Sequence, residues 1–358
     1  MKEFDLIQYR LANQRLAGEP LETPEQVVSW LTAVQAQDFY GAMWSLAQRT
    51  RGLSEAEVER AFTAGTILRT HVMRPTWHFV TPSDIRWLLE LTARRVHAVS
   101  GNYYRRHDLD EATFARSNDV LANALQGGKE LTRAELTSAL EQAGIANSDD
   151  NLRHTLVVMH AELDAVICSG GRRGKQFTYA LLDERAPEAT RLGQDEARAE
   201  LARRYFESHG PATLKDFRWW SGMLAGDAQA SLDMVASQLA CEVIDGETYW
   251  FVERALRIEP AAPVAHLLQT YDEYLIGYTD RSAALQPQDS EKLDSRSQTI
   301  VVDGKVVGTW QRTLKRGEVH VTARTFVSLT AAQRAAIEAA AARYAAFLGL
   351  PLTLSFSL

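Results

Sequence analysis

One arrangement recurs along most of this chain and limits how it can fold: two or three helices followed by two short strands with a turn between them. The first copy predicts helices over 24–34, 39–49 and 55–64 and strands over 67–72 and 76–80. Asp38 is placed to cap the second of these helices. Ser54 and Glu57 form a capping box for the third.

The second and third copies repeat this order. The second predicts helices over 133–143 and 149–162 and strands over 165–168 and 176–181, and the third predicts helices over 213–220 and 227–239 and strands over 241–244 and 247–252. Thr132 and Glu135 form a capping box, and Asp245 with Gly246 supplies a hairpin turn. Helices followed by a hairpin are the layout of a winged helix, a helix-turn-helix variant with a β-hairpin wing.

From about His266 the pattern changes to alternating β-like runs, with a hairpin around Asp303 and Gly304 and a final helix that Thr330 can cap. At 358 residues the chain is too long for one core, because single cores stop growing near about 250–300 residues. We therefore predict an α+β fold of tandem winged-helix units and a C-terminal β-rich domain, with a linker over 254–264. The predicted domains are 1–110 (first unit), 111–190 (second unit), 191–258 (third unit) and 259–358 (β-rich domain with the final helix).

The chain carries 39 Lys and Arg residues against 46 Asp and Glu residues, a formal net charge of −7. Any binding to nucleic acid must therefore come from local basic patches. The N-terminal run MKEFDLIQYRL is too acidic for a signal peptide, and the Ala-rich stretch over 331–350 is interrupted by charges, so we expect no membrane segment. Cys168 and Cys241 form no CxxC pair, which favours a reducing cytoplasm and argues against disulfides and zinc.

Common enzyme motifs are absent from the sequence. The segment SGGRRGKQ departs from a phosphate-binding loop, because Ser169 replaces the first glycine and Gln176 replaces the Ser or Thr that binds Mg²⁺. There is no HExxH, no GxSxG and no dinucleotide-binding GxGxxG after a strand. His154 and His160 do not share a helix face. We expect neither a metal nor a cofactor.

The same segment forms the tip of the second predicted hairpin and is strongly basic. Arg172, Arg173 and Lys175 place three cations on a Gly-rich turn, and we predict that they contact DNA phosphates; a solvated hairpin tip is the alternative. A second cluster is equally compatible with DNA contact and with an ordinary helix surface. It comprises Arg94, Arg95, Arg105 and Arg106 with Tyr103 and Tyr104.

Two glutamines occupy the junction between the first two predicted helices. On a continuing helix, Gln35 and Gln37 would point in nearly opposite directions, but the Asp38 cap predicts that the first helix has ended there. Across a non-helical turn the two amides could converge on one water, each offering an acceptor and a donor. Spacing alone favours the simpler interpretation of polar residues at a helix end.

Longer strings around these residues resemble a known family. AVQAQDFYGAMWSLAQR and LRTHVMRPTWHFVTPSD resemble the winged-helix DNA-binding family that contains the AlkZ-type DNA glycosylases, and LLQTYDEYLIGYTDRS and VVDGKVVGTWQRT are similar to its C-terminal domain. The resemblance extends from about residue 5 to residue 350 in the same order. It implies three tandem winged helices around a concave channel, with a C-terminal β-barrel-like domain.

The resemblance also assigns residues. The family has a catalytic Gln–apolar–Gln or Gln–apolar–Asp motif, which stands here as Gln35-Ala36-Gln37; the double-Gln form is associated with relatives that remove bulky alkylated or cross-linked purines. The family's usual Arg-Gly-Thr-Leu-His stretch reads RPTWH at 74–78. We expect Arg74 and His78 to contact phosphate or the lesion. The alternatives are an ion pair for Arg74 and a structural role for His78.

The resemblance implies a DNA glycosylase that excises N7- or N3-alkylated purines by water attack at C1′ and leaves an abasic site. No lysine motif suggests Schiff-base lyase chemistry, so we expect a monofunctional enzyme. Because such a purine is cationic and leaves as a neutral base, two neutral amides that hold a water could suffice. We expect Gln37 to orient the water and Gln35 to support the water or the deoxyribose. The expected partner is double-stranded DNA with alkylated bases, bound by a monomer in the cytoplasm at the nucleoid.

Two alternatives remain: a non-catalytic winged-helix DNA-binding protein, such as a transcriptional regulator, and a protein-interaction module. The acidic run around DEYLIGYTDR is predicted to be structural, because carboxylates near DNA would repel it. Its charged residues, Asp272, Glu273, Asp280 and Arg281, are therefore expected to form internal salt bridges and caps. One of Trp219 and Trp220 is expected to lie in the core.

Overall fold

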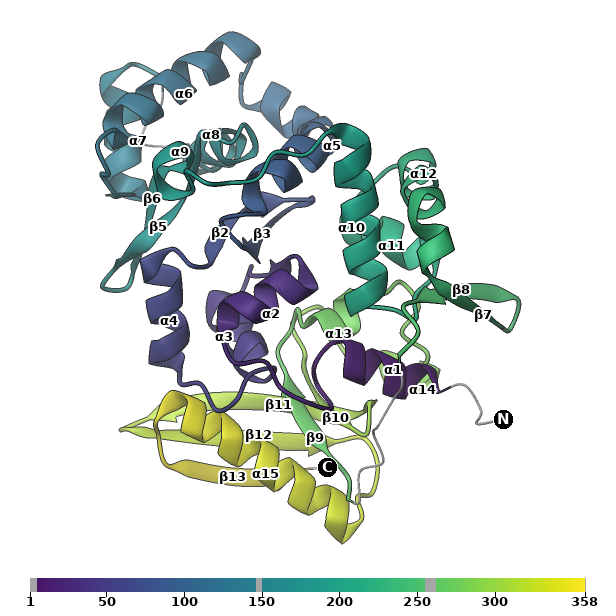
Figure 1. Cartoon of the computed structure of the whole chain (residues 1–358). Helices are drawn as coiled ribbons and strands as arrows, with labels where there is room; N and C mark the ends of the chain where they lie inside the picture. Colours follow the sequence, from purple (N-terminus) through teal and green to yellow (C-terminus); the bar gives the residue numbers. More distant parts are fainter. Residues whose placement is uncertain (1–4, 146–149, 255–261, 358) are drawn as a thin grey trace.

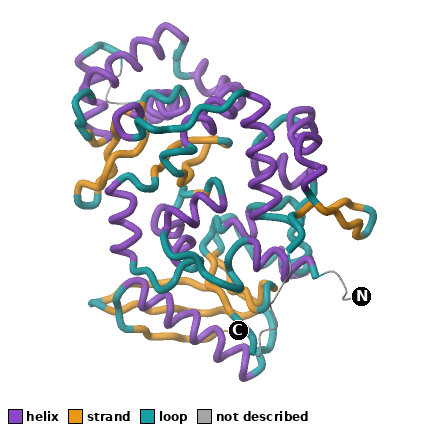
Figure 2. The backbone as a smooth tube through the Cα atoms, in the orientation of Figure 1, coloured by secondary structure: helices purple, strands orange, loops and turns teal. Residues whose placement is uncertain are grey.

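The computed structural model describes residues 5–145, 150–254 and 262–357 as a mixed fold of helices and β-sheets (Figure 1). Figure 2 shows the strands gathered in separate groups, each with helices beside it. Most of the predicted linker over 254–264, with the predicted domain boundary at 258–259, lies outside the described residues. Within the described ranges, every helix is too short or too polar to cross a lipid bilayer.

The first unit confirms the predicted helices and hairpin. It comprises α1 (Leu6–Asn13), α2 (Pro24–Leu31), β1 (Val34–Gln35), α3 (Phe39–Ala47), α4 (Glu55–Ala64), β2 (Leu68–Val72) and β3 (Arg74–Val80). The strands form an antiparallel sheet in the order β1-β3-β2. The first predicted helix was three residues too long: Thr32 adopts a left-handed φ of 70°, and Val34 then pairs with Phe79 in the sheet.

The second unit follows a long helix, α5 (Ile85–Arg106), which sequence periodicity had not singled out. It comprises α6 (Glu111–Leu125), β4 (Leu131–Thr132), α7 (Arg133–Gln142), α8 (Asn151–Leu163), β5 (Ile167–Arg173), β6 (Gln176–Leu181) and α9 (Leu182–Arg185). Its sheet has the order β4-β6-β5. The predicted capping box is confirmed, since the Glu135 carboxylate accepts the Thr132 N–H at 2.7 Å.

The third unit has the same ingredients but a smaller sheet. It comprises α10 (Gln194–Ser208), α11 (Leu214–Ser221), α12 (Ala225–Val235), a short 3-10 turn (Ala236–Gln238), β7 (Ala240–Ile244) and β8 (Glu247–Phe251). The prediction that Asp227 starts a helix was wrong: the helix begins at Ala225, with Leu224 as its N-cap. Ala212 forms an isolated bridge to Trp250 where the other units have their first strand.

The three units therefore share one order of elements: a helix, a short strand or bridge, two helices and a hairpin. In the first two units, the short strand joins the sheet beside the second strand of the hairpin, as in β1-β3-β2 and β4-β6-β5. This repeated order places the short β1 strand of the first unit between two helices and beside β3.

The C-terminal part is one sheet with a helix packed on it, seen at the bottom of Figure 1. It comprises β9 (Ala265–Leu268), α13 (Glu273–Ile276), α14 (Pro287–Ser290), β10 (Gln298–Val302), β11 (Lys305–Lys315), β12 (Glu318–Thr325), α15 (Ala331–Leu348) and β13 (Leu352–Ser357). The strand order is β13-β12-β11-β10-β9, and among the described residues no pairing joins β9 to β13. The sheet is therefore open and not the barrel-like domain that was predicted, and α15 packs on its apolar face.

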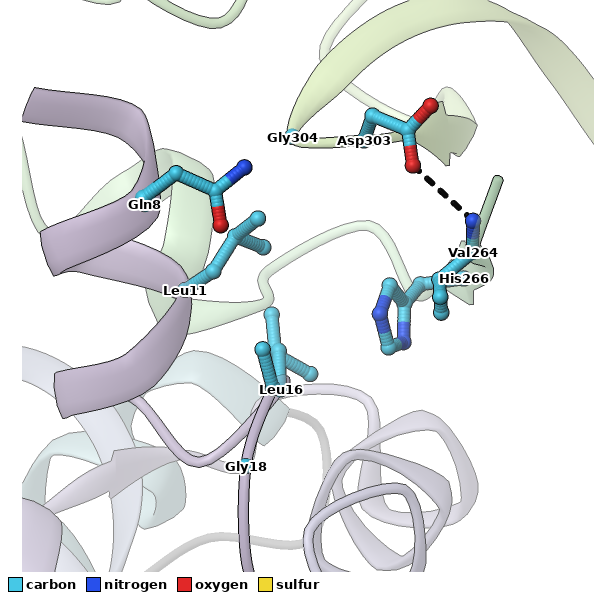
Figure 3. Close-up of a pocket in the computed structure, with 9 residues that line it drawn as sticks. Gln8, Leu11, Leu16, Gly18, Val264, His266, Asp303 and Gly304 are labelled. Atoms are coloured by element: carbon cyan, nitrogen blue, oxygen red, sulfur yellow. Dashed lines mark hydrogen bonds between the residues drawn. The ribbon is translucent and has the colours of Figure 1, made fainter. Parts of the chain in front are cut away.

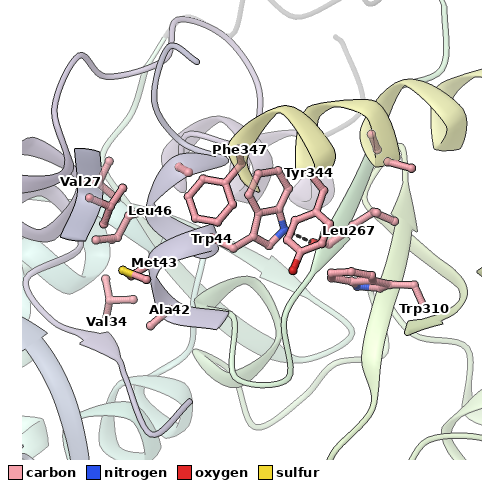
Figure 4. Packing of buried hydrophobic residues seen from close by; sticks show 14 of the residues in the cluster. Val27, Val34, Ala42, Met43, Trp44, Leu46, Leu267, Trp310, Tyr344 and Phe347 are labelled. Atoms are coloured by element: carbon pink, nitrogen blue, oxygen red, sulfur yellow. Dashed lines mark hydrogen bonds between the residues drawn. The ribbon is translucent and has the colours of Figure 1, made fainter. Parts of the chain in front are cut away.

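The main core joins this sheet to the first unit. Trp44 of α3 packs edge-on against Tyr344 of α15, with ring centroids 5.0 Å apart, and donates its indole N–H to the carbonyl of Leu267 in β9 at 2.7 Å (Figure 4). Trp310 of β11, 2% exposed, packs on the other side of Tyr344. The first unit and the C-terminal domain thus share one continuous apolar core.

A buried ion pair fastens the same two parts together. Arg49, which follows α3, contacts Asp272 through both of its terminal nitrogens, at 2.7 and 2.9 Å, and both side chains have 0% exposure. Asp272 also caps α13 by accepting the N–H of Tyr274 at 3.0 Å. Although burial raises the pKa of this carboxyl, the Arg49 guanidinium holds the pKa below its usual value. The predicted structural role of Asp272 is confirmed.

Candidate functional site

The two glutamines lie in a short extended segment between α2 and α3. Gln35 is the last residue of β1 and is 9% exposed, while Gln37 is exposed in the bend that precedes α3. Ala36 between them is fully buried. Asp38 caps α3 by accepting the N–H of Gly41 at 3.1 Å, so the predicted helix end and cap are confirmed. The strand ends at Gln35, and Gln37 lies two residues further on in the bend, with the buried Ala36 between the two glutamines.

The sheet places Gln35 beside His78. Gln35 of β1 is the direct partner of His78 of β3, which is in turn the partner of Thr70 of β2. Side chains directly opposite each other in an antiparallel pair share one face, with their Cβ atoms about 4.5–5.5 Å apart. Two of the predicted site residues, distant in sequence, are therefore adjacent on one face of the first unit's sheet.

His78 is a neutral hydrogen-bond acceptor in this arrangement. Burial, and then the charge of Arg74, lower the pKa of His78 to about 3. Its Nδ1 lies 2.9 Å from the carbonyl of Thr76, which assigns the ring proton to Nδ1. The Nε2 atom is then free to accept, and Nη2 of Arg74 lies 3.5 Å from it. His78 is fully buried, which favours a structural role for this residue over direct contact with DNA. Arg74 is only partly buried.

A buried carboxylate from the C-terminal part of the chain holds the backbone of the glutamine segment. Glu273 of α13, 0% exposed, accepts the backbone N–H of Gln35 and the indole N–H of Trp220, each at 2.9 Å. Nε2 of His209 lies 3.5 Å from the same carboxylate. Although burial raises the pKa of Glu273, the His209 contact and the charge of Arg74 bring the pKa below its usual value. Glu273 is thus ionised, and its oxygens are already occupied by donors.

Arg69 and Trp77 hold the middle of the motif. Nε of Arg69 in β2 donates to the carbonyl of Ala36 at 3.0 Å, and the Ala36 N–H donates to the carbonyl of Trp77 at 2.7 Å. The Arg69 guanidinium also stacks over the Trp77 ring, 4.3 Å from its centroid. Burial lowers the pKa of Arg69 to about 10, so this arginine stays charged at neutral pH. Sequence reasoning identified neither Arg69 nor the support by Glu273, since both depend on contacts between distant segments.

The predicted basic tip is largely occupied by internal contacts. Arg172 contacts Glu59 at 3.6 Å and the hydroxyl of Tyr40 at 3.2 Å, and its side chain is only 5% exposed. Nη1 of Arg173 donates to both oxygens of the Glu135 carboxylate, at 2.7 and 3.0 Å. Lys175 is exposed at the turn. The phosphate contacts predicted for these three residues stay a prediction.

The two neighbouring tryptophans differ as expected. Trp220 is 0% exposed, whereas Trp219 is 49% exposed and donates its indole N–H to the carbonyl of Ile276 at 3.1 Å. Asp280 accepts the N–H of Ser282 at 2.8 Å, which is a local turn contact.

One cluster of potential metal ligands occurs among the described residues, at some remove from the glutamines. His97 of α5 and His160 of α8 each lie 3.1 Å from the Asp164 carboxylate. Although burial raises the pKa of Asp164, hydrogen bonds from both histidines hold it far below its usual value. Asn118 also donates to this carboxylate at 2.8 Å. These polar contacts account for the cluster without a metal ion.

A cavity of about 300 Å³ lies between α1 and the β10–β11 turn (Figure 3). His266 is its only histidine, and burial followed by the charge of Arg343 lowers the pKa of His266 to about 3. Gly304 is required in the turn: its φ is 80°, and a Cβ atom there would lie 2.1 Å from Ile7 of α1. This cavity brings no pair of catalytic groups together, and it is not part of the candidate site.

Comparisons with known proteins identify the family and the fold. A family model described as DNA glycosylase AlkZ-like matches residues 28–347. One relative, the interstrand DNA cross-link repair glycosylase of Streptomyces sahachiroi, is 26% identical over 327 residues, which cover 85% of this chain and 86% of that protein. The solved structure of Streptomyces sahachiroi DNA glycosylase AlkZ matches with a TM-score of 0.81 at 23% identity, covering 99% of this chain and 100% of that chain, so the two share a fold. The chain belongs to the AlkZ-like DNA glycosylase family.

Proposed function

We propose that this chain is a monofunctional DNA glycosylase that excises alkylated purines, including bulky and cross-linked ones, from double-stranded DNA. The observation that carries the proposal is the Gln35–Gln37 segment, held in place by Glu273 in a member of this family. One relative is named an interstrand DNA cross-link repair glycosylase, which supports the inclusion of bulky and cross-linked purines among the substrates.

The state of the neighbouring groups favours catalysis by amides. Glu273 is fully buried and accepts two hydrogen bonds from the protein, so it does not reach a water in the exposed bend at Gln37. His78 is neutral, and its Nε2 faces Arg74. The amides of Gln35 and Gln37 are left to hold the attacking water. In well-oriented systems, positioning of this kind contributes up to about 7–11 kcal/mol to the lowering of the barrier.

The chemistry follows from the charge of the lesion. An alkylated N7 or N3 gives the purine a positive charge, and cleavage of the bond to C1′ releases it as a neutral base. The electron deficiency passes to the sugar, where a water held by Gln37, with Gln35 supporting the water or the deoxyribose, adds to C1′ and loses a proton to solvent. The products are the free base and an abasic site. A neutral pair of amides performs this role without burying an unpaired charge.

The same proposal includes the architecture and the DNA contacts. We assign the three units with the shared element order as winged helices over 1–110, 111–190 and 191–258, acting as a monomer on duplex DNA. Arg74 is proposed to contact DNA directly and His78 to orient it. Lys175 is proposed to contact phosphate at the wing, with Arg172 and Arg173 joining it by exchanging their carboxylate partners for phosphate.

The test is base release from a duplex that carries one N7-alkylguanine, compared with spontaneous depurination. Gln35→Ala and Gln37→Ala are expected to abolish excision while retaining DNA binding. Gln126→Ala, at an exposed glutamine that ends α6, is the matched control and is expected to keep full activity. Strand cleavage without alkali would overturn the monofunctional assignment. Binding without base release on simple, bulky and cross-linked substrates alike would favour a regulator instead.

A further inference from the structure

A second, strongly basic cavity lies where the first and third units meet. It has a volume of about 390 Å³, and it is lined by Arg74 of β3, Arg95 of α5, and Lys215, Arg218 and Trp219 of α11. None of its lining residues is acidic, although the chain as a whole has a net charge of −7. We call it the basic cavity.

Among the described residues, the cations of the basic cavity form no salt bridge with a carboxylate, unlike several other arginines. Arg95, Lys215 and Arg218 are exposed, and no salt bridge or hydrogen bond joins their side chains to any described residue. Nε of Arg74 is buried and has no partner within the same ranges. By contrast, Arg172 and Arg173 at the predicted wing already contact Glu59 and Glu135. The charges of Glu273 and Asp280 reach Arg74 and Lys215, respectively, but neither carboxylate forms a salt bridge with them among the described residues. Three exposed cations beside Arg74 are therefore available to an anion.

The basic cavity adjoins the candidate active site through Arg74. Nη2 of Arg74 lies 3.5 Å from Nε2 of His78, and His78 pairs with Gln35 in the sheet. The wall on this side is tightly packed: a Cβ atom on Gly222, which follows α11, would lie 2.5 Å from the carbonyl of Met73. The end of α11 is therefore packed closely against the start of β3, which carries Arg74.

The shape of the cavity also suits nucleic acid. Trp219 is 49% exposed, and its indole N–H is fixed by the carbonyl of Ile276 at 3.1 Å, so the ring offers a flat apolar surface in a set orientation. Aromatic surfaces of this kind beside basic side chains are typical of contacts to sugars and bases next to their phosphates. The combination matches a nucleotide backbone better than a free inorganic anion.

We infer that the basic cavity binds backbone phosphates of the damaged DNA strand through Arg95, Lys215 and Arg218. These contacts set the register in which the damaged nucleotide reaches Gln35, and Arg74 links the two sites. This inference rests on the proposed function, since it supplies the DNA contacts that excision requires. It assigns the main phosphate contact to the junction of the first and third units, whereas the sequence predicted it at the wing.

The experiment measures the affinity for an undamaged duplex as a function of salt, using the full chain. Each phosphate contact adds about 0.9 to the slope of log affinity against log salt concentration. Arg95→Ala, Lys215→Ala and Arg218→Ala are each expected to lower that slope by about 0.9. Between about 50 and 200 mM salt, each should make the loss of affinity roughly three- to fourfold smaller.

Arg94→Ala is the matched control, because Arg94 is exposed next to Arg95 on α5 but does not line the cavity. It is expected to leave the slope unchanged. An equal effect of Arg94→Ala would show that only the general surface charge matters and would overturn the inference. Within the part of the chain that the structure describes, no salt bridge or hydrogen bond involves the side chains of Arg94, Arg95, Lys215 or Arg218. The thermal midpoint of each variant is therefore expected to match that of the parent protein.

Two further results separate this inference from neighbouring explanations. Calorimetry could show that inorganic phosphate binds to the parent protein but not to the Lys215 and Arg218 variants. If these variants also keep the parental salt slope for DNA, the cavity is a small-anion site and the inference is wrong. Because the duplex carries no lesion, the outcome does not depend on excision. A parent protein that fails to release base would therefore overturn the proposed function while leaving the phosphate contacts measurable.

Discussion

Glu273→Gln is the sharpest test of how the fold supports the glutamine segment. The carboxylate accepts the N–H of Gln35 and the indole N–H of Trp220, each at 2.9 Å, through different oxygens. The glutamine that replaces it has the same shape but only one oxygen. In either orientation its NH₂ group must face one of the two donors, which then has no acceptor.

The expected magnitude follows from these two bonds. A buried donor without an acceptor costs about 1–3 kcal/mol, and the surviving bond loses its charge assistance, so we expect the free energy of unfolding to fall by about 2–4 kcal/mol. The rate of base excision is expected to change more than the stability does. If the segment shifts by about 1 Å, the rate of base release under single-turnover conditions should fall by roughly a hundredfold. Affinity for duplex DNA should change by less than about twofold, because Glu273 is fully buried.

Asp84→Asn supplies the control. Asp84 is also buried, at 4% exposed, and likewise accepts an indole N–H, that of Trp87 at 3.0 Å, but it does not contact the Gln35–Gln37 segment. Because Asp84 also forms a salt bridge with Arg204 at 2.7 Å, this variant is expected to lose at least as much stability. It is expected to retain its excision rate when assayed below its unfolding transition. The reasoning would be refuted if Glu273→Gln excised at the parental rate, or if Asp84→Asn slowed excision to the same extent.

Three further predictions concern stability. Asp272→Asn leaves the buried Arg49 charge without its partner and is expected to lower the free energy of unfolding by about 3–5 kcal/mol in urea titrations; a loss below 1 kcal/mol would contradict it. The pKa of His78 is about 3 in the folded protein and 6.5 for the free side chain, so the unfolded chain binds a proton more readily. The free energy of unfolding is therefore fully retained above pH 6.5 and falls as the pH is lowered from 6.5 toward 3. This loss amounts to about 2 kcal/mol between pH 6.5 and 5, and His78→Gln should remove it from the difference between unfolding curves at the two pH values. Gly304 has a φ of 80°, and a Cβ atom there would lie 2.1 Å from Ile7 of α1, whereas Gly246 has a φ of 84° and open space around it. Gly304→Ala should therefore lower the thermal midpoint more than Gly246→Ala. Equal shifts would mean that the contact with α1 contributes nothing.

The local parts of this fold were predictable from sequence because their signals are local. The caps at Asp38, Thr132 and Thr330 and the turn at Asp303 each depend on residues within about four positions of one another, and the structure has all of them. The end of α2 was misplaced because nothing in the nearby sequence announces the pairing of Val34 with Phe79 in another strand.

The site was predictable only in outline. The segment containing the glutamines was found through its resemblance to a family, and the Asp38 cap correctly indicated that it is not helical. What surrounds it depends on pairs far apart in the chain, such as Arg69 with the carbonyl of Ala36 and Glu273 with the N–H of Gln35. Charge counting placed three free cations at the second hairpin, but it could not reveal that carboxylates from other helices contact two of them.

The hydrogen bond from Gln35 to Glu273 spans 238 residues of sequence, and this separation has a consequence for synthesis on the ribosome. Translation proceeds at about 5–20 residues per second, so roughly 12 to 48 s pass between the emergence of the first partner and that of the second. During this interval the nascent chain has completed its helical units, but the segment with the glutamines still lacks its anchor. An unfinished chain therefore lacks the hydrogen bond that anchors the glutamine segment, which forms only once the C-terminal domain has folded onto the first unit.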